Sequence, residues 1–240
     1  MKIIISGYGR MGKEIEKVAL NEGHLIVDRI DNVNDWARIE RNQVVADAVI
    51  DFSQPVVAVE NILRCFEMGI PIVTGTTGWY DQLEEVSELC KQQNGALFYA
   101  PNFSIGVNLF FLINKKLAKR MSSFGEYKVS MKEMHHIHKL DAPSGTAIKV
   151  AEDIIAEHNL IEKWSKSDES ESGILPIVSE RKGEIPGTHI VTYSSDADVI
   201  ELKHEAKNRS GFAVGAVKAA EWLAAKKGIF NMDDFLKSIL

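Results

Sequence analysis

The sequence predicts an α/β protein: a doubly wound parallel sheet, followed by a second, smaller domain with several strands. Three observations predict this class. Short apolar runs alternate with amphipathic stretches through the N-terminal part of the chain, as in strands joined by crossover helices. A glycine-rich turn joins the first run to the first amphipathic stretch. After Phe103 the alternation gives way to one long helical stretch and then mainly to strands.

The first elements form a dinucleotide-binding pattern. The β-branched run Lys2–Ser6 is followed at once by Gly7-Tyr8-Gly9-Arg10-Met11-Gly12 and an amphipathic stretch that ends at Asn21. In this G-x-G-x-x-G pattern, Gly7 and Gly9 permit a tight turn and close approach of a pyrophosphate, and Gly12 lets the helix pack on the strand.

A candidate ribose-binding carboxylate follows the second strand. Leu25–Ile30 is an apolar run, and Asp31 comes directly after it, nineteen residues beyond Gly12, about where such a carboxylate is expected. Asp31 could also be an ordinary turn residue, and Asp28 competes with it from inside the strand. An acidic residue favours the free 2′-hydroxyl of NADH, whereas an arginine accommodates the 2′-phosphate of NADPH. Arg10 is one such arginine, so we favour NADH slightly and expect some tolerance of NADPH.

Further alternation extends the parallel sheet. Strands are expected at residues 48–52, 72–74 and 97–100, with helices at residues 55–67 and 80–91. Ligands of such sheets bind beyond the carboxyl ends of the strands. Two loops begin there, Gly75-Thr76-Thr77-Gly78 and Ala100-Pro101-Asn102-Phe103. They could hold the nicotinamide ribose and carboxamide, although Gly-Thr-Thr-Gly is also an ordinary turn.

The second part of the chain predicts a different kind of sheet. A helix is expected at residues 106–120, and strands at residues 127–135, 174–180, 189–194 and 199–204. The polar residues 163–173 indicate a solvated loop or flap, and the Ala-rich residues 213–226 indicate a helix that returns to the first domain. Several strands with one main helix leave a sheet face open, so we expect a second subunit to cover it.

Residues 133–147 carry the strongest chemical signal. His135 and His136 are adjacent, Lys139 follows, and Ser144 precedes a helix that starts near Gly145. Imidazole can donate a proton near neutral pH, and a capped helix N-terminus favours a carboxylate or phosphate. Each residue alone would be an ordinary surface or capping residue, but together they indicate a site that binds an anion and donates a proton.

Composition excludes several other classes. The chain has 240 residues, 45% hydrophobic and 26% charged, with a net charge of −6, which argues against nucleic-acid binding. No apolar run is long enough to span a membrane. No metal site is expected, because the histidines of residues 135–138 lack an i, i+4 pair and the two cysteines, Cys65 and Cys90, are isolated. So few cysteines favour a reducing cytoplasm.

The run from Glu133 to Thr146, Glu-x-His-His-x-x-Lys-x-Asp-Ala-Pro-Ser-Gly-Thr, resembles the signature of the 4-hydroxy-tetrahydrodipicolinate (dihydrodipicolinate) reductase family of lysine and diaminopimelate biosynthesis. The likeness spans nearly the whole chain. It includes Gly-Arg-Met-Gly at 9–12, the two loops at 75–78 and 100–103, Pro-Gly-x-His at 186–189, and Arg-x-x-Phe-Ala-x-Gly-Ala at 209–216. Many members have one more residue in the glycine loop, so cofactor preference is not transferred.

The resemblance implies a fold, an assembly and an activity. The fold would be a Rossmann-type domain, residues 1–104 and 212–240, and a smaller α+β domain, residues 105–211, whose open mixed sheet binds substrate and builds a homotetramer. The activity would be NAD(P)H-dependent reduction of 4-hydroxy-tetrahydrodipicolinate, a small dicarboxylate, to tetrahydrodipicolinate. Whether the enzyme itself catalyses the dehydration is left open.

The resemblance also implies roles by position. His135 would be the proton donor and Lys139 its partner in catalysis and substrate binding, while His136, Gly145 and Thr146 would hold the substrate carboxylates. The cofactor would lie against Gly7, Gly9, Arg10, Met11, Gly12, Asp31, Gly75, Thr76, Thr77, Ala100, Pro101, Asn102 and Phe103. Two alternatives remain: another imine reductase of this architecture, and a non-catalytic dinucleotide sensor.

Overall fold

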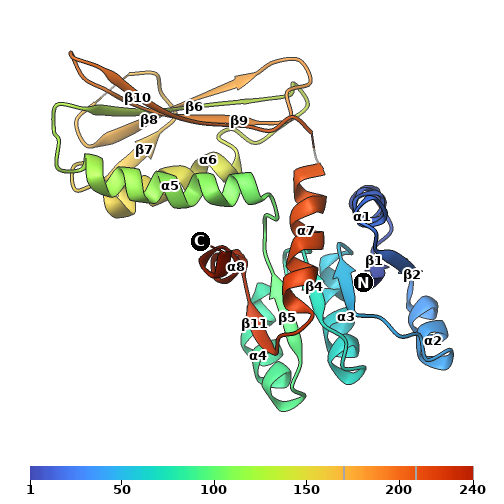
Figure 1. Ribbon diagram of the computed structural model, residues 1–240. Helices are drawn as coiled ribbons and strands as arrows, with labels where there is room; N and C mark the ends of the chain where they lie inside the picture. Colours follow the sequence, from blue (N-terminus) through green and yellow to red (C-terminus); the bar gives the residue numbers. More distant parts are fainter. Residues whose placement is uncertain (170, 209, 240) are drawn as a thin grey trace. The chain divides into compact units, whose positions relative to one another are not determined.

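The computed structural model describes residues 1–169, 171–208 and 210–239. The chain divides into two compact units (Figure 1). Unit 1 comprises Met1–Ile105 with Ser210–Leu240, and unit 2 comprises Gly106–Arg209. Each unit has its own sheet and its own buried apolar core.

Unit 1 contains a six-stranded sheet in which every strand pair is parallel. The strand order is β11-β5-β4-β3-β1-β2. The strands are β1 (Lys2–Ser6), β2 (Leu25–Ile30), β3 (Ala48–Asp51), β4 (Ile72–Thr74), β5 (Ala96–Tyr99) and β11 (Gly228–Phe230). This order places the carboxyl ends of β1 and β3 next to each other, which is where a doubly wound sheet binds its ligand.

Helices complete unit 1. They are α1 (Arg10–Asn21), α2 (Val33–Arg41), α3 (Pro55–Glu67), the short 3₁₀ turn η1 (Tyr80–Gln82), α4 (Leu83–Gln92), α7 (Ser210–Leu223) and α8 (Met232–Ile239). Helix α1 packs against α7, and α3 packs against α4. Buried residues of the strands, such as Ile4 and Val49, share one cluster with Trp36 of α2 and Ile62 of α3. The predicted α/β class with a parallel sheet is confirmed.

Unit 2 contains a mixed five-stranded sheet in the order β10-β9-β6-β8-β7. Strand β9 is antiparallel to β6 and β10, whereas β8 is parallel to β6 and β7. The strands are β6 (Lys128–His135), β7 (Lys163–Ser165), β8 (Ile174–Arg181), β9 (Thr188–Ser194) and β10 (Val199–Glu205), and the helices are α5 (Ile105–Met121) and α6 (Gly145–Glu157). Both helices lie on one face of the sheet (Figure 1).

Several local predictions need correction. Residues 163–173 were predicted as a loop, but Lys163–Ser165 form β7 at the sheet edge, with Trp164 packed against the core; Ser170 lies outside the described residues. The strand was not predicted because it has three residues and lies in a charged segment. Helix α2, strand β11 and helix α8 were not predicted. No helix within residues 1–169, 171–208 and 210–239 has the length and apolarity to cross a membrane.

Candidate active site

The glycine loop of unit 1 is too tightly packed to admit side chains at two of its three glycines. Gly7 has φ +83°, and a Cβ there would lie 2.3 Å from the carbonyl oxygen of Phe52. A Cβ on Gly12 would lie 2.3 Å from the carbonyl oxygen of Gly7. Gly9, in contrast, has open space around its Cβ position. It precedes α1, whose first turn has no side-chain cap, so N–H groups there are available to an anion.

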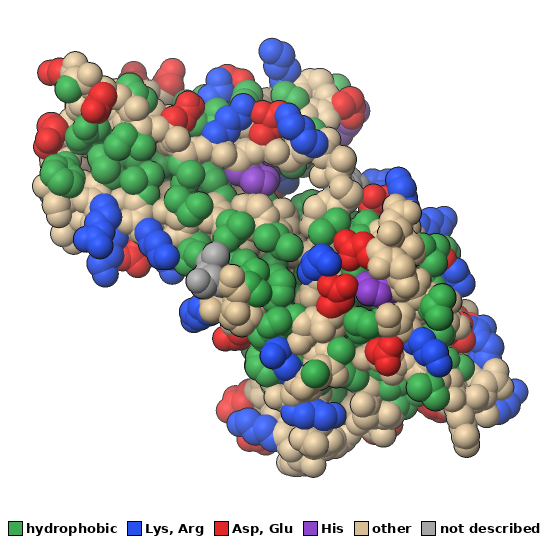
Figure 2. All heavy atoms as spheres, viewed as in Figure 1, with side chains coloured by type: hydrophobic (Ala, Val, Ile, Leu, Met, Phe, Trp, Pro, Cys, Tyr) green, Lys and Arg blue, Asp and Glu red, His purple; other side chains and the backbone are tan. Residues whose placement is uncertain are grey.

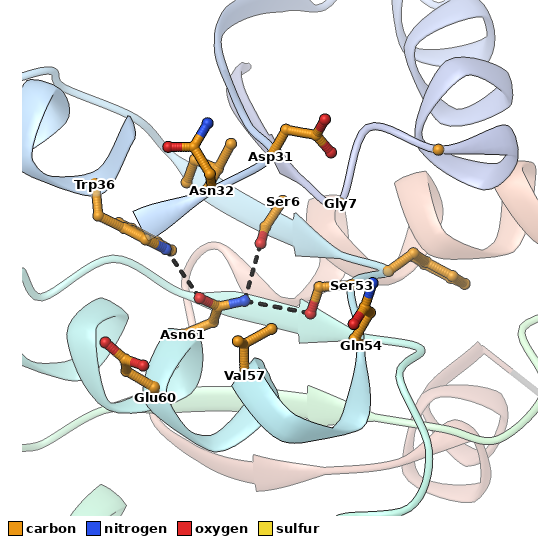
Figure 3. A pocket seen from close by; sticks show the side chains of 13 residues that line it. Ser6, Gly7, Asp31, Asn32, Trp36, Ser53, Gln54, Val57, Glu60 and Asn61 are labelled. Atoms are coloured by element: carbon orange, nitrogen blue, oxygen red, sulfur yellow. Dashed lines mark hydrogen bonds between the residues drawn. The ribbon is translucent and has the colours of Figure 1, made fainter. Parts of the chain in front are cut away.

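A pocket of about 380 Å³ opens beside this loop (Figure 3). It lies at the carboxyl ends of the first three strands, which carry Ser6, Asp31 and Phe52 at or just after their last residues. Its other lining residues are Gly7, Gly9, Ile30, Asn32, Trp36, Ser53, Gln54, Val57, Glu60 and Asn61. The Asp31 carboxylate accepts a hydrogen bond from the Tyr8 backbone N–H at 3.3 Å. Size, position and the acidic residue fit the adenosine half of a dinucleotide.

A buried polar network forms the floor of the pocket. The Asn61 side chain accepts from the Trp36 indole N–H at 2.8 Å and donates to Asp51 at 3.0 Å (Figure 3 shows the Trp36 bond). Asn61 also donates to the hydroxyls of Ser6 and Ser53. These hydrogen bonds fix the ends of β1 and β3 relative to α3.

The same network reaches the predicted nicotinamide loop. The Thr76 hydroxyl donates to the buried Asp51 carboxylate at 2.8 Å, so this hydroxyl supports the loop from inside. A Cβ on Gly75 would lie 2.3 Å from the Phe52 ring, whereas Thr77 is exposed.

The second predicted loop, residues 100–103, is partly a core element. Phe103 is buried and its ring lies 5.6 Å from that of Phe52. Ala100 is buried, Pro101 is exposed and Asn102 is half-buried.

Two arginines near the ribose edge of the pocket are paired with acids. Arg29 forms an ion pair with Glu16 and stacks on the Tyr8 ring, 5.4 Å from its centroid. Arg38 pairs with Asp28, the competing ribose candidate, and with Asp35. Hydrogen bonding to Glu16 raises the pKa of Arg29, and hydrogen bonding to Asp28 raises that of Arg38.

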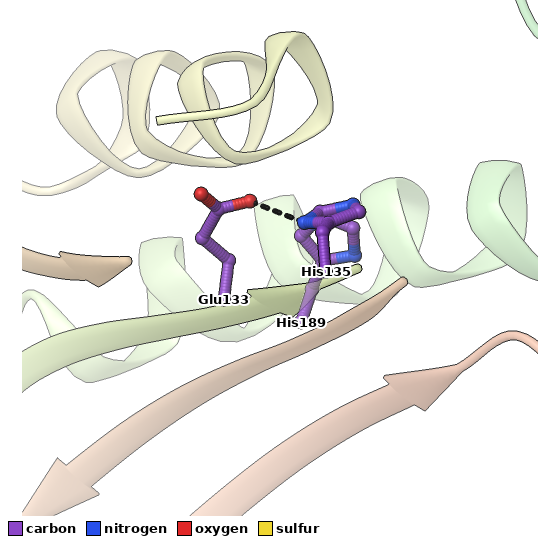
Figure 4. A group of neighbouring side chains, drawn as sticks. All are labelled: Glu133, His135 and His189. Carbon is purple, nitrogen blue, oxygen red and sulfur yellow. Dashed lines mark ion pairs between the residues drawn. The ribbon is translucent and has the colours of Figure 1, made fainter. Parts of the chain in front are cut away.

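In unit 2, strand β6 carries the candidate proton donor. Its residues alternate between the two faces of the sheet, and Glu133 and His135 lie on the buried face with Val129 and Met131. The His135 Nδ1 atom lies 2.8 Å from a Glu133 carboxylate oxygen (Figure 4). The Arg181 guanidinium of β8 donates to the other oxygen at 2.9 Å.

Glu133 is ionised in this setting. Burial is the largest single influence and raises its pKa, but hydrogen bonds from His135, Ser144, Ser179 and Arg181 together outweigh burial and hold the pKa well below its usual value. A carboxylate with no exposed surface therefore lies directly against His135.

His189 of β9 completes the cluster as a neutral imidazole. Its ring lies edge-on to that of His135 at 5.1 Å, and its Nε2 atom is 3.2 Å from the Ser144 hydroxyl. Burial, followed by the proximity of His135, lowers the pKa of His189 to about 4. The Ser144 hydroxyl also accepts from the Ala147 backbone N–H, so the predicted cap of α6 is confirmed.

The loop that follows β6 carries the remaining predicted residues. The Lys139 ammonium pairs with Asp141 at 2.8 Å. Arg181 donates to the backbone carbonyl oxygens of both residues, so one guanidinium holds this loop and Glu133 together. His136 is half-buried.

The N-terminus of α6 leaves room for an anion. No atom lies within 4 Å of a Cβ position on Gly145, and Thr146 is half-buried beside it. Residues 135–146 thus place a histidine, a lysine and a helix N-terminus in one unit, as their spacing in the sequence predicted.

Three residues of the candidate site were not assigned to it from the sequence. Glu133 stands two positions before His135, and strand alternation places it on the same face, so a signal was present. His189 lay in the Pro-Gly-x-His motif. Arg181 had no signal, because only strand pairing brings it to Glu133. Glu133, His135 and His189 also place ligand atoms within 4.8 Å of one another, a spacing that can hold a metal ion.

Unit 1 has the fold and glycine loop of a dinucleotide-binding domain, and unit 2 has a buried acid–imidazole pair beside the N-terminus of α6. Together they define an NAD(P)-dependent oxidoreductase of the Rossmann type. Family models described as dihydrodipicolinate reductase, N-terminus and C-terminus, match residues 1–103 and 106–236. The chain belongs to the dihydrodipicolinate reductase family.

Two relatives agree with this assignment, and a solved structure shares the fold. A 4-hydroxy-tetrahydrodipicolinate reductase of Christiangramia forsetii is 46% identical over 239 residues, covering 100% of this chain and 99% of the relative. One of Archaeoglobus fulgidus is 36% identical, covering 99% and 100%. A solved dipicolinate-bound dihydrodipicolinate reductase from Paenisporosarcina sp. TG-14 has the same fold, with TM-score 0.77 and 24% identity over 98% of each chain.

Proposed function

We propose that this protein reduces 4-hydroxy-tetrahydrodipicolinate to tetrahydrodipicolinate with NAD(P)H, in lysine and diaminopimelate biosynthesis. The observation that carries the proposal is the buried Glu133–His135 pair beside the α6 N-terminus, in a chain whose full length matches this family. Bound NAD(P)H supplies the hydride. Unit 1 binds the cofactor, and unit 2 binds the dicarboxylate and donates the proton.

The residues of unit 1 fit a dinucleotide. Gly7 and Gly12 have no space for side chains, and Gly9 leaves the loop open beside the uncapped start of α1. The pyrophosphate would bind to backbone N–H groups of residues 9–12, including Arg10 and Met11. Asp31 would accept the ribose hydroxyls.

The pocket favours NADH. Asp31 and Glu60 are the charged side chains among its lining residues, and a 2′-phosphate would be repelled by them. Both nearby arginines, Arg29 and Arg38, are bound to acids. Arg10, exposed at the start of α1, is the residue that permits some use of NADPH.

In unit 2, a substrate carboxylate would bind to Lys139 and to the N–H groups of Gly145 and Thr146, with His136 beside them. These positive groups draw electron density away from the carbon that accepts the hydride. His135 then protonates the ring as negative charge develops on it. The substrate gains one hydride and one proton and loses its 4-hydroxyl group as water, so the overall conversion balances.

The activity is tested by following cofactor absorbance at 340 nm, with substrate generated from pyruvate and aspartate semialdehyde by the preceding synthase. Oxidation that depends on both precursors is the expected result. His135→Ala and Lys139→Ala should each lower turnover by about a hundredfold or more. A folded variant with the wild-type rate would exclude that residue as a catalytic one.

The same assay compares cofactors. We expect a higher kcat/KM with NADH than with NADPH, and Asp31→Ser should raise the NADPH:NADH ratio. Arg10→Ala should lower it, because the variant removes an exposed cation at the start of α1. A wild-type preference for NADPH would contradict this interpretation of the pocket.

Two alternative functions give different results. Another imine reductase would oxidise NADH with other cyclic imines and not with this substrate. A dinucleotide sensor would bind NADH without turnover, but it would not need the buried pair Glu133–His135 or the loop that carries Lys139.

We also propose a homotetramer assembled through unit 2. In the described residues, helices cover one face of its sheet (Figure 1), and Val199 and Ile200 of β10 are exposed. Figure 2 shows further hydrophobic side chains over the α5 region, where Ile113 and Phe124 are exposed. Light scattering of the full chain should give four times the chain mass.

A further inference from the structure

Glu133 occupies a position that packing alone would give to an apolar residue. On its face of β6 the neighbouring positions are the buried Val129 and Met131, and none of its side chain is exposed. Burying an ionised carboxylate costs several kcal/mol unless charged and polar partners surround it. Because burying this charge is costly, we expect the Glu133 carboxylate to have a chemical role.

The two oxygens of Glu133 have different partners. One accepts from the Arg181 guanidinium at 2.9 Å, which is always protonated. The other lies 2.8 Å from Nδ1 of His135. Among the described residues, this oxygen and Nδ1 are both buried and neither has a hydrogen-bonding partner elsewhere, so their ion-pair contact is what each atom faces.

This pairing determines which nitrogen of His135 carries a proton. An ionised carboxylate only accepts hydrogen bonds, so Nδ1 must donate. The other nitrogen, Nε2, is then the one that gains and loses the exchangeable proton. A methyl group on Gly187 would lie 3.0 Å from Nε2, so the glycine leaves space on that side of the ring.

The other groups around His135 do not favour its protonation. Arg181 of β8 and Lys139 of the following loop are cations, whereas His189 of β9 is buried and His204 of β10 is half-buried, and burial is the main cause that lowers the pKa of each. The Ser144 hydroxyl at the start of α6 is neutral. Glu133 is the one carboxylate in direct contact with the ring among the described residues.

We propose that Glu133 is a positioning residue that holds His135 as the Nδ1–H form and keeps Nε2 able to carry and deliver the proton. The inference rests on the proposed role of His135. In the step itself, the imidazolium loses its Nε2 proton to the substrate, and the Nδ1–H remains bonded to Glu133. The ring then recovers a proton from solvent at Nε2.

The test compares Glu133→Gln with the wild type across pH in the full chain. A carboxylate that orients a catalytic imidazole and sets its tautomer can be worth far more than tenfold in kcat, so kcat should fall by about tenfold or more. KM for the dicarboxylate should change by less than about twofold, because Lys139 and the α6 N-terminus remain. Glu180→Gln is the matched control, since Glu180 pairs on the surface with Lys132 and the variant should behave as the wild type.

The pH profile separates positioning from a merely structural role. Activity is lost as pH rises and the proton donor deprotonates. Removing an adjacent negative charge disfavours the imidazolium, so the alkaline limb of kcat should move to lower pH. A folded Glu133→Gln variant with the wild-type limb would overturn the proposal.

Nitrogen-15 NMR of the wild-type imidazoles tests the positioning proposal even if the Glu133→Gln variant does not fold. The neutral His135 ring should carry its proton on Nδ1, and a ring protonated on Nε2 would overturn the proposal. His135→Gln distinguishes the two levels of inference. If it retains the wild-type rate, the proton-donor role itself fails; if it is inactive while Glu133→Gln has an unchanged profile, only the positioning role fails.

Discussion

Buried, neutral His189 should make the stability of unit 2 depend on pH. Its pKa in the folded protein is about 4, against about 6.5 in an unfolded chain. Between these values the unfolded chain binds a proton that the folded protein does not, so folding is disfavoured as pH falls. The contribution is fully present above pH 6.5 and is lost as pH falls toward 4. At about 1.4 kcal/mol per pH unit, the loss is about 3 kcal/mol.

The assay is urea denaturation of the wild type and His189→Gln at several pH values from 7.5 to 4. A glutamine can still hydrogen-bond to the Ser144 hydroxyl, which lies 3.2 Å from Nε2 of the histidine, but it does not titrate. The free energy of unfolding of the wild type should therefore fall by about 3 kcal/mol more than that of the variant. Parallel curves over this range would refute the argument. His158→Gln should differ from the wild type in the same direction, because burial also lowers the pKa of His158.

Three further predictions concern packing and charge. Gly12→Ala places a methyl group 2.3 Å from a carbonyl oxygen of the glycine loop; it should destabilise unit 1 by about 1–3 kcal/mol and weaken NADH binding in calorimetry. Asn61→Leu removes the amide that donates to Oδ1 of the buried Asp51, while the Thr74 and Thr76 hydroxyls still donate to Oδ2; it should lower the denaturation free energy by about 1–3 kcal/mol. Arg181→Met leaves Glu133 charged and without its cation; the loss, about 3–5 kcal/mol at pH 7, should shrink at low pH, where Glu133 can protonate.

Most of unit 1 could be predicted because its signals are local. A β-branched run, a glycine turn and an amphipathic helix follow one another without interruption, and the structure forms β1 and α1 at the predicted residues. Helix α2 was missed because its capping box starts at Asn32, directly beside the residue already assigned to ribose binding. Strand β11 has three residues, too few for a pattern to be recognised.

The hydrogen-bond network beneath the pocket could not be predicted from the sequence, for a different reason. Asn61 lies in the middle of α3, where an amide side chain is usually expected to be exposed at the surface. Only the parallel register of β1 and β3 brings Ser6 and Asp51 within reach of its side chain. The loop at residues 75–78 lies where it was predicted. Its Thr76 hydroxyl points inward because it donates a hydrogen bond to Asp51, and no sequence motif connects these two residues.

In unit 2 as well, contacts between residues close in the sequence could be predicted, whereas contacts made through strand pairing could not. The sequence places His135, Lys139 and Ser144 together because they are close along the chain. It does not show that β8 runs parallel to β6 with Arg181 opposite His135, and that pairing supplies a cation that is one of the four groups keeping Glu133 ionised. Loss of Arg181 would weaken the set of hydrogen bonds that outweighs burial at Glu133, and a protonated carboxyl could no longer fix the proton of His135 on Nδ1. The state of the proposed donor therefore depends on a residue forty-six positions away in the sequence, through a strand pairing that no local motif encodes.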